Sequence, residues 1–516
     1  MEDSMQKKFH AYQVEPDKRL GYLWLILGTL LSLFAANGRW DIPLAAWLYP
    51  LFFLRFMRTS NIVVGLLGLW LASAGATLFF LYESQILTPF IFISAQILGT
   101  MLLLPFLLDR LLAPRLGAGS GLLATLIFPL SRVACEYLTT LVPYGTGGGL
   151  LGYTQQGNLP LIQIVAITGV YGVSFLIAWF ASVGNWIWEQ HFAWPRIRLT
   201  TLLYSGVLAL TLLGGGCRLA FFPPSASTIR VAGISAAPAA SHKALEALRN
   251  FPTSEQLAHA NPAQLRPEFA ALNEELLKRS LQEAQAGAKI VVWPEGGAMT
   301  LAEDETALIE GGKNLTRKTG IYLEMGLIVF LHQAPYAENK TILLDPQGRV
   351  LWTYHKVHPF GTETYTPGNP IVPVVDTLYG RLANVICFDA DDPDLMRQGG
   401  RKGADIMLVP SNDWQGIDPW HTQNATFRAI EDGYSVVRQT SNGLAMSVDY
   451  QGHVLAATDY FTTDAQTMIA YVPREGALTI YPFIGDLFVW LCIAGLFLLG
   501  GYVLYSSWQK RWRAAK

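Results

Sequence analysis

Apolar stretches of nearly membrane-spanning length constrain the fold of this chain more than any other feature. An α-helix needs about 20 apolar residues to cross the hydrocarbon core of a bilayer. The stretches that approach this length are residues 21–37, 42–56, 61–80, 88–109, 119–142, 159–187, 199–221 and 482–507. The second is short, so it either tilts in with its neighbours or re-enters the membrane. The sequence therefore predicts a multi-pass helical domain with about eight spans.

The charges of the chain agree with a membrane protein. Charged residues make up only 15% of the sequence and hydrophobic residues 51%, a balance typical of membrane proteins. The net charge of −2 argues against nucleic acid as a partner, because phosphate binding needs a concentrated basic surface.

Lysine and arginine residues gather on one side of the predicted spans. When the N-terminus is placed in the cytoplasm, the inner segments hold fourteen basic residues: Lys7, Lys8, Lys18, Arg19, Arg55, Arg58, Arg110, Arg115, Arg196, Arg198, Lys510, Arg511, Arg513 and Lys516. The short outer segments hold only Arg39 and Arg218. Cytoplasmic loops carry the excess of basic residues. We therefore expect both chain ends in the cytoplasm and the segment between the seventh and eighth spans outside it.

The segment from about residue 228 to 478 has the composition of a soluble domain. Its apolar β-rich runs are 229–235, 289–294, 322–331, 341–345, 349–355, 381–387, 404–410, 434–439, 443–449 and 467–472. Its helical patterns are 266–287, 301–318, 393–400 and 419–432. Strands alternating with helices predict a layered α/β structure. The predicted domains are residues 1–225 with seven spans, 226–478 outside the membrane, and 479–516 with the last span and a basic tail.

One cysteine stands apart from the others. Cys135, Cys217 and Cys492 lie in apolar runs, whereas Cys387 lies in the soluble segment. A lone thiol has no partner in its own domain, so a structural disulfide is not expected. Cys387 is then either an inert buried thiol or a nucleophile.

Two further polar residues follow apolar runs of the same segment, namely Glu295 and Lys356. Each has a plain structural alternative: a helix-capping carboxylate for Glu295 and a solvated charge at a hairpin end for Lys356. Open α/β sheets place their ligands at strand ends. A carboxylate base, a cation and a thiol would together support acyl transfer, with the cation favouring the thiolate and stabilising an oxyanion.

The motifs around these three residues resemble the signatures of the nitrilase superfamily, in the same order. They are Trp293-Pro294-Glu295, Tyr354-His355-Lys356 and Cys387-Phe388-Asp389. The resemblance implies an αββα sandwich with Glu295 as general base, Lys356 as the group that stabilises the oxyanion and thiolate, and Cys387 as nucleophile. Phe388, Asp389 and Glu363 are expected to support them.

The membrane part resembles bacterial apolipoprotein N-acyltransferases in Gly152-Tyr153-Thr154-Gln155, in 169–176 and in the position of the soluble domain. This resemblance implies transfer of an acyl chain from phospholipid to the α-amine of the diacylglyceryl-cysteine that begins a lipoprotein, through a thioester. It also implies the bacterial inner membrane, with the catalytic domain on the periplasmic side. No cofactor and no metal are expected.

Three departures from the family pattern leave the acceptor open. Asp389 stands where the family has Glu, Gly296 follows Glu295 where the family often has Thr, and Glu363 takes the place of a second acid after a run that is one residue longer. The alternatives are a membrane-tethered amidase or hydrolase, a paralogue with another amine acceptor, and a non-catalytic protein that binds lipid or protein.

Five other residues are candidates for substrate binding. Trp414, Trp420 and Tyr365 lie in predicted loops near the site, where aromatic side chains either meet acyl chains or simply pack. Arg132 and Glu136 are four residues apart on the fifth predicted span. Ionisable groups at that depth are candidates for function, here along a headgroup path, or else satisfy each other.

Overall fold

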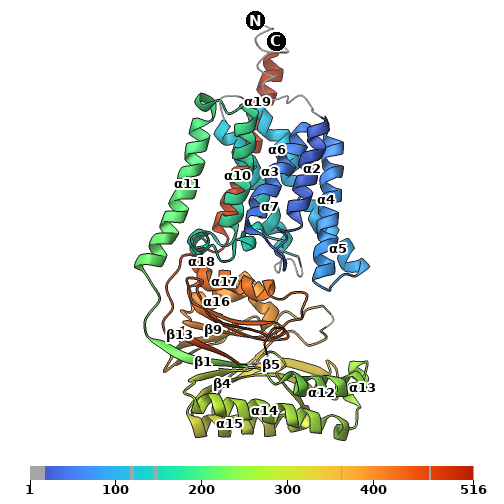
Figure 1. Ribbon diagram of the computed structural model, residues 1–516, viewed down its shortest axis with the longest axis vertical. Helices are drawn as coiled ribbons and strands as arrows, with labels where there is room; N and C mark the ends of the chain where they lie inside the picture. The colour runs from blue at the N-terminus through green and yellow to red at the C-terminus, as the bar shows by residue number, and fades with distance from the viewer. Residues whose placement is uncertain (1–17, 117–120, 143–148, 362, 464–466, 515–516) are drawn as a thin grey trace. The chain divides into compact units, whose positions relative to one another are not determined.

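The computed structural model describes residues 18–116, 121–142, 149–361, 363–463 and 467–514 (Figure 1). Lys7, Lys8 and Lys516 of the charge pattern, and the first residues of the 119–142 stretch, lie outside the described residues. The chain divides into two compact units, Met1–Phe221 with Ile484–Lys516, and Phe222–Phe483.

The first unit is helical, and a helix occupies each predicted apolar stretch. The helices are α2 (Lys18–Ser32), α3 (Pro43–Thr59), α4 (Ile62–Glu83), α5 (Pro89–Met101), α6 (Leu104–Leu112), α7 (Gly121–Thr140), α10 (Tyr171–Glu189), α11 (Trp194–Phe221) and α19 (Leu487–Ala514). Among the described residues, five helices are long and apolar enough to cross a membrane, and a sixth counts if a bent pair forms one span. The helices α2 and α3, with 15 and 17 residues, are shorter than a standard span.

The stretch 159–187 differs from the single span that its hydropathy predicts. It contains α8 (Leu159–Ile162) and α9 (Val165–Thr168), followed by α10 at an angle of 117°. The break lies at Gly169, whose φ of 64° is easily adopted only without a side chain. Hydropathy reports that these residues are apolar, but it carries no information on the direction of the backbone.

The second unit contains two β-sheets. Its strands are β1 (Thr228–Ile234), β2 (Ile290–Val292), β3 (Ala298–Leu301), β4 (Tyr322–Phe330), β5 (Ala337–Leu344), β6 (Val350–His355), β7 (Val374–Thr377), β8 (Gly380–Asn384), β9 (Ile406–Asn412), β10 (Ser435–Ser441), β11 (Leu444–Val448), β12 (Val454–Asp459) and β13 (Thr467–Pro473). Within the described residues, one sheet has the order β13-β1-β2-β4-β5-β6 with β3 beside β4, and the other the order β12-β11-β10-β9-β8-β7. The first and last strands of the unit pair antiparallel along their whole length, with Thr228 opposite Pro473.

Helices cover the outer faces of both sheets. Figure 1 shows α14 (Arg266–Gln285) and α15 (Glu305–Thr319) on the sheet that contains β4, and α16 (Pro393–Arg401) and α17 (Trp420–Asp432) on the sheet that contains β9. One apolar cluster lies between the sheets, with Val231, Val292, Leu408 and Val436 among its members, and another lies under α14 and α15. The predicted layered α/β domain is therefore confirmed, and its layers follow the order αββα.

Several elements of this unit are missing from the sequence prediction. They are β3, β7, β12, α12 (Pro238–Arg249) and α13 (Ser254–Ala258). The strands β7 and β12 lie at one sheet's two edges, and none of their residues is fully buried. Edge strands of this kind lack the apolar alternation that identifies a strand in a sequence.

Candidate active site

Glu295 is held by the backbone that follows the short strand β2. The buried Trp293 donates its indole N–H to Ser280 Oγ at 2.9 Å, which fixes the chain just before the acid. The carbonyl of Pro294 passes so close to β4 that a Cβ at Gly326 would overlap its oxygen. Close approach of two backbones requires glycine at this position. The carboxylate of Glu295 is consequently directed by a rigid turn and is only 4% exposed.

Lys356 directly follows β6 and meets Glu295 in the interior. Its backbone N–H donates to the carbonyl of Asn339 at 3.0 Å, which continues the pairing with β5. Its Nζ donates to Glu295 Oε1 at 2.8 Å and to Glu363 Oε2 at 2.8 Å. The side-chain amide of Asn339 donates to the same Glu295 oxygen at 2.6 Å. The ammonium is therefore clamped between two carboxylates, and Lys356 is only 1% exposed.

The charges around Lys356 decide its ionisation. Burial alone would lower the pKa of this amine, but the negative charges of Glu295 and Glu363 outweigh burial and raise it well above its ordinary value. Burial raises the pKa of Glu363, and the nearby charge of Lys356 opposes that rise. The surrounding carboxylates therefore favour the ammonium form of Lys356.

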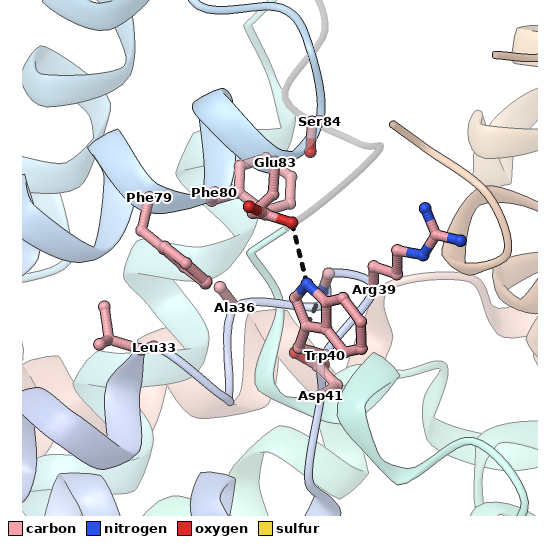
Figure 2. Close-up of a pocket in the computed structure, with 10 residues that line it drawn as sticks. Leu33, Ala36, Arg39, Trp40, Asp41, Phe79, Phe80, Glu83 and Ser84 are labelled. Atoms are coloured by element: carbon pink, nitrogen blue, oxygen red, sulfur yellow. Dashed lines mark hydrogen bonds between the residues drawn. The ribbon is translucent and has the colours of Figure 1, made fainter. Parts of the chain in front are cut away.

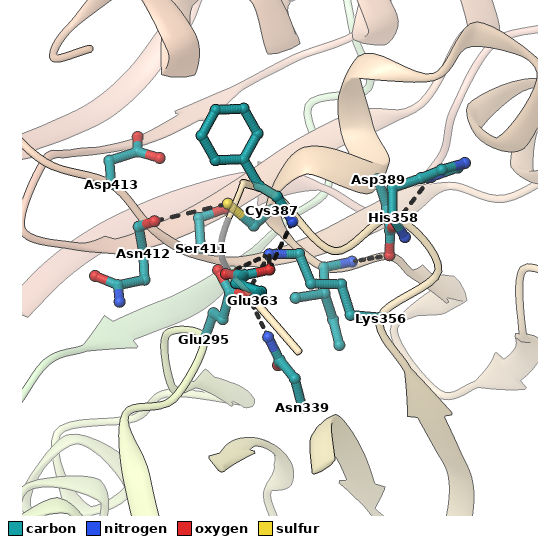
Figure 3. Close-up of polar contacts among 12 residues, drawn as sticks. Glu295, Asn339, Lys356, His358, Glu363, Cys387, Asp389, Ser411, Asn412 and Asp413 are labelled. Atoms are coloured by element: carbon teal, nitrogen blue, oxygen red, sulfur yellow. Dashed lines mark hydrogen bonds and ion pairs between the residues drawn. The ribbon is translucent and has the colours of Figure 1, made fainter. Parts of the chain in front are cut away.

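Cys387 begins the 3₁₀ helix η5 (Cys387–Asp391), three residues after the end of strand β8 at Asn384. Its φ of 48° lies in the left-handed region, which is unusual for a residue with a side chain and marks local strain. The thiol faces the carbonyl of Asn412 at 3.7 Å. Figure 3 shows the sulfur beside the cluster of Lys356, Glu295 and Glu363, with its dashed line running to the carbonyl oxygen of Asn412.

The surroundings of Cys387 favour the protonated thiol. Burial raises the pKa of Cys387 well above its ordinary value, the charge of Glu295 raises it further, and Lys356 opposes both. A buried thiol of this kind needs a base within reach before it can attack a carbonyl carbon. Glu295, whose charge acts on the thiol, is the candidate for that base.

Asp389 supports the turn that carries Cys387. Its carboxylate is fully buried and accepts hydrogen bonds from Tyr354 Oη at 2.9 Å, from the backbone N–H of His358 at 2.8 Å and from those of Val357 and Ile386. These donors come from both sides of the site. Asp389 thus connects the segment that follows Lys356 to the turn that carries Cys387.

Comparison with known proteins supplies the family. A family model described as the apolipoprotein N-acyltransferase N-terminal domain matches residues 27–183, and one described as carbon-nitrogen hydrolase matches residues 230–478. The chain belongs to the apolipoprotein N-acyltransferase family. The resemblance found in the motifs is thereby confirmed.

Named members of the apolipoprotein N-acyltransferase family match over most of their length. The protein from Geobacter metallireducens is 28% identical over 413 residues, which cover 74% of this chain and 74% of the relative. The protein from Haemophilus influenzae is 25% identical and covers 73% of each chain. A crystal structure of an amidase from Nesterenkonia sp. overlaps 49% of this chain and 92% of its own, with 19% identity and a TM-score of 0.36.

The predicted aromatic residues of this N-acyltransferase family member lie in different settings. Trp414 packs against Phe360, with ring centroids 5.6 Å apart, and Phe360 packs against Phe388 at 5.2 Å. Trp420 is buried at the start of α17. Tyr365 is half-buried, and burial followed by the charges of Glu363 and Glu295 raises its pKa. Tyr365 therefore lies near the carboxylates of the site, and Trp414 packs on the aromatic side chain next to Phe388.

Arg132 and Glu136 belong to the helical unit, on α7. Arg132 Nε donates to Glu136 Oε1 at 2.8 Å, and the backbone N–H of Leu151 donates to the same oxygen at 3.2 Å. Both side chains are buried. The pair thus holds the start of the 3₁₀ helix η2 (Leu151–Gln155), which carries part of the family motif, while Glu136 Oε2 is buried without a hydrogen bond among the described residues.

A pocket of the helical unit contains none of the predicted site residues (Figure 2). It is lined by Arg39, Trp40, Asp41 and Glu83 together with apolar side chains, and the indole of Trp40 donates to Glu83 Oε2 at 2.9 Å. This pocket is not part of the candidate active site.

Sequence reasoning missed Asn339 and a set of buried charged residues beside Cys387. That set consists of Asp413, His421 and Arg438, together with Asp391, and every member is at most 5% exposed. Arg438 stands in the apolar strand β10, and Asn339 in β5. A charged residue inside a buried strand is the signal that could have identified Arg438, because such residues are almost never buried without a partner.

The set contains residue types that bind metals, but its space is filled. Cys387 Sγ, a carboxylate oxygen of Asp413 and a ring nitrogen of His421 all lie within 4.8 Å of one another. Arg438 Nη2 lies 3.3 Å from Asp413 Oδ1 and 2.9 Å from His421 Nδ1. A guanidinium therefore occupies the position between these groups and would repel a cation.

Proposed function

We propose that this protein transfers an acyl chain from a phospholipid to the α-amino group of the diacylglyceryl-cysteine at the N-terminus of lipoproteins, with Cys387 carrying the acyl group as a thioester. Its family relatives are named for lipoprotein N-acylation, and the chain is accordingly an acyltransferase. The observation that supports the chemistry is the meeting of Lys356 with Glu295 beside the thiol of Cys387.

The first half-reaction forms the thioester. Glu295 takes the proton of the Cys387 thiol as the sulfur attacks the ester carbonyl carbon of the phospholipid. The negative charge that develops on the carbonyl oxygen is stabilised by the ammonium of Lys356 and by the backbone N–H of Phe388. The C–O bond then breaks, and Glu295 returns the proton to the departing lysophospholipid hydroxyl.

The second half-reaction passes the acyl group to the amine. The neutral α-amine of the lipoprotein attacks the thioester carbonyl, and the same cation stabilises the second tetrahedral intermediate. The C–S bond breaks as the amide forms. Glu295 carries the proton lost by the amine to the sulfur, which restores the thiol. Both substrates therefore use one nucleophile in turn.

We further propose that this chemistry takes place at the bacterial inner membrane. The proposed topology has eight spans with both chain ends in the cytoplasm, a catalytic domain of residues 226–478 on the periplasmic side, and flanking segments 1–225 and 479–516. It is supported by the helix found at each predicted apolar stretch and by the excess of basic residues in the inner segments. A cysteine-labelling scan of the loops with a membrane-impermeant reagent tests it.

A two-substrate assay tests the proposed function. Purified full-length protein is incubated with phospholipid labelled in its acyl chains and with a diacylated lipopeptide that has a free α-amine. Labelled triacylated peptide is the expected product, with lysophospholipid formed in equal amount. Labelled free fatty acid alone would point to a hydrolase, and no reaction with either water or amine would point to a binding protein. A lipopeptide with an acetylated amine is the matched control and should accept no label.

Replacement of Lys356 by methionine is expected to lower turnover about 10²–10³-fold, because the oxyanion loses its cationic partner. The measurement is the initial rate of peptide acylation at saturating donor. Lys340→Met is the matched control, since Lys340 is also a buried lysine held between two carboxylates, Glu305 and Glu338. Comparable rates in the two variants would remove Lys356 from the mechanism.

A further inference from the structure

A buried set of charged residues lies next to Cys387 and takes no direct part in the proposed chemistry. His421 Nδ1 lies 2.7 Å from Asp413 Oδ1, and His421 Nε2 lies 2.8 Å from Asp391 Oδ2. Arg438 Nη2 donates to Asp413 Oδ1 at 3.3 Å. The four residues come from α17, the segment after β9, η5 and β10. We call them the charge cluster.

The charge cluster holds both ends of the turn that carries the thiol. Arg438 Nη1 donates to the carbonyl oxygen of Cys387 at 3.4 Å, at the first residue of η5. Asp391, the last residue of η5, is held by His421. The φ of 48° at Cys387 persists only if its surroundings enforce it. Arg438 and His421 supply that constraint from one side, as Asp389 does from the other.

The ionisation of the charge cluster follows from its contacts. Burial alone would lower the pKa of His421, but the carboxylates of Asp413 and Asp391 outweigh it and raise the pKa to about 9. Burial alone would raise the pKa of Asp413, but His421 and Arg438 outweigh it and lower the pKa. Two cations thus balance two carboxylates. Both ring nitrogens of His421 are engaged, Nδ1 with Asp413 Oδ1 and Arg438 Nη2, and Nε2 with Asp391 Oδ2, so neither is free to act as a base.

Arg438 also acts on the sulfur through its charge. The carboxylates of Glu295 and Asp413 face Cys387 from the ends of β2 and β9 and raise the pKa of the thiol. Lys356, which follows β6, and Arg438, in β10, lower it. Removal of either cation would therefore raise the pKa of the Cys387 thiol further.

We propose that Arg438 is a positioning residue for Cys387: it fixes the strained turn through the cysteine carbonyl, and its charge favours the thiolate. Asp413 and Thr422 orient it, since Thr422 Oγ1 accepts from Arg438 Nε at 3.1 Å. The inference rests on the proposed role of Cys387 as nucleophile. It adds a second cation, on the other sheet, to the lysine that the reaction uses directly.

The test measures thiol reactivity, which requires no lipid donor. In full-length protein with Cys135, Cys217 and Cys492 replaced by alanine, the rate of Cys387 alkylation by iodoacetamide is followed as a function of pH. Arg438→Met is expected to move the midpoint of this profile up by about one unit, the scale of a single lost charge partner. Arg438→Lys keeps the charge but cannot hold Cys387 and Asp413 together, so a shift of about half a unit or less is expected, together with a lower kcat for acylation.

The matched control is Arg428→Met. Arg428 is an equally buried arginine of the same unit, paired with Glu431 Oε2 at 2.7 Å. Its loss is expected to lower Tm without moving the alkylation profile. An unmoved profile in Arg438→Met, with a Tm loss like that of Arg428→Met, would overturn the proposal and leave Arg438 a structural residue. If Arg438→Met does not fold, Arg438→Lys decides, and an unmoved profile with unchanged kcat overturns the proposal.

Failure of the proposed function would look different from failure of this inference. A shifted alkylation profile without any peptide acylation by the parent protein would reject the acyl acceptor and retain Arg438 as a positioning residue. Normal acylation with an unmoved profile and unchanged kcat would reject Arg438 alone.

Discussion

Replacement of Cys387 by alanine is expected to abolish the covalent acyl adduct and to lower peptide acylation by at least about 10⁴-fold, the loss typical of removing a nucleophile. The sulfur is the atom that would carry the acyl group, and the described residues place Glu295 and Lys356 around it. Intact-mass analysis after incubation with phospholipid alone measures the adduct. Without an amine acceptor, the parent protein should accumulate one acyl group per chain.

The control for this experiment is Cys492→Ala. Cys492 is also a buried free thiol, but it lies on α19 of the helical unit. Its replacement should leave adduct and acylation unchanged. An adduct that persists in Cys387→Ala would assign the acyl group to another residue and reject the thioester mechanism. Equal thermal stability of the two variants would show that the loss is chemical.

Replacement of Glu295 by glutamine is expected to lower turnover by about 10²–10⁴-fold, the contribution of a well-placed general base. Glutamine has nearly the same shape and can still accept from Asn339 Nδ2, which donates to Glu295 Oε1 at 2.6 Å. The fold should therefore survive while proton transfer from the thiol is lost. Single-turnover measurement of adduct formation isolates this step, because no amine is present and product release plays no part.

Glu283→Gln is the matched control for the loss of a paired carboxylate. Glu283 pairs with Arg230 at 2.6 Å, away from the thiol. Its replacement should leave the rate of adduct formation within about twofold, since a partly exposed ion pair contributes little to structure. An equally small effect in Glu295→Gln would mean that another group accepts the proton of the thiol.

The sequence predicted those parts of the protein that short stretches of neighbouring residues determine. Glu295, Lys356 and Cys387 each follow an apolar run within a recognisable motif, and the structure gathers them, with Glu363, around one ammonium. The apolar stretches likewise predicted where the membrane helices lie. These signals need only neighbouring residues, because hydropathy and motif spacing are properties of a short window of chain.

Other parts of the site depend on contacts between distant segments. Arg438 and Asn339 lie inside strands, and only the packing of the two sheets determines which face each side chain takes. The bend before α10 depends on the backbone at Gly169 rather than on hydropathy. The acid at position 389 looks like a loss in the sequence, yet the fold surrounds it with four donors. Each of these features depends on contacts between residues far apart in the sequence, so no pattern of neighbouring residues could predict it.

The pairing of β1 with β13 has a consequence for how such a protein can arise. The residues at which the αββα unit begins and ends, Thr228 and Pro473, face each other across one strand pair. A domain whose first and last residues lie close together can be inserted into a loop of a host protein without moving the two ends of that loop apart. Ancestral fusion of a free-standing enzyme with a lipid-embedded carrier would then require one gene insertion and no redesign of either partner.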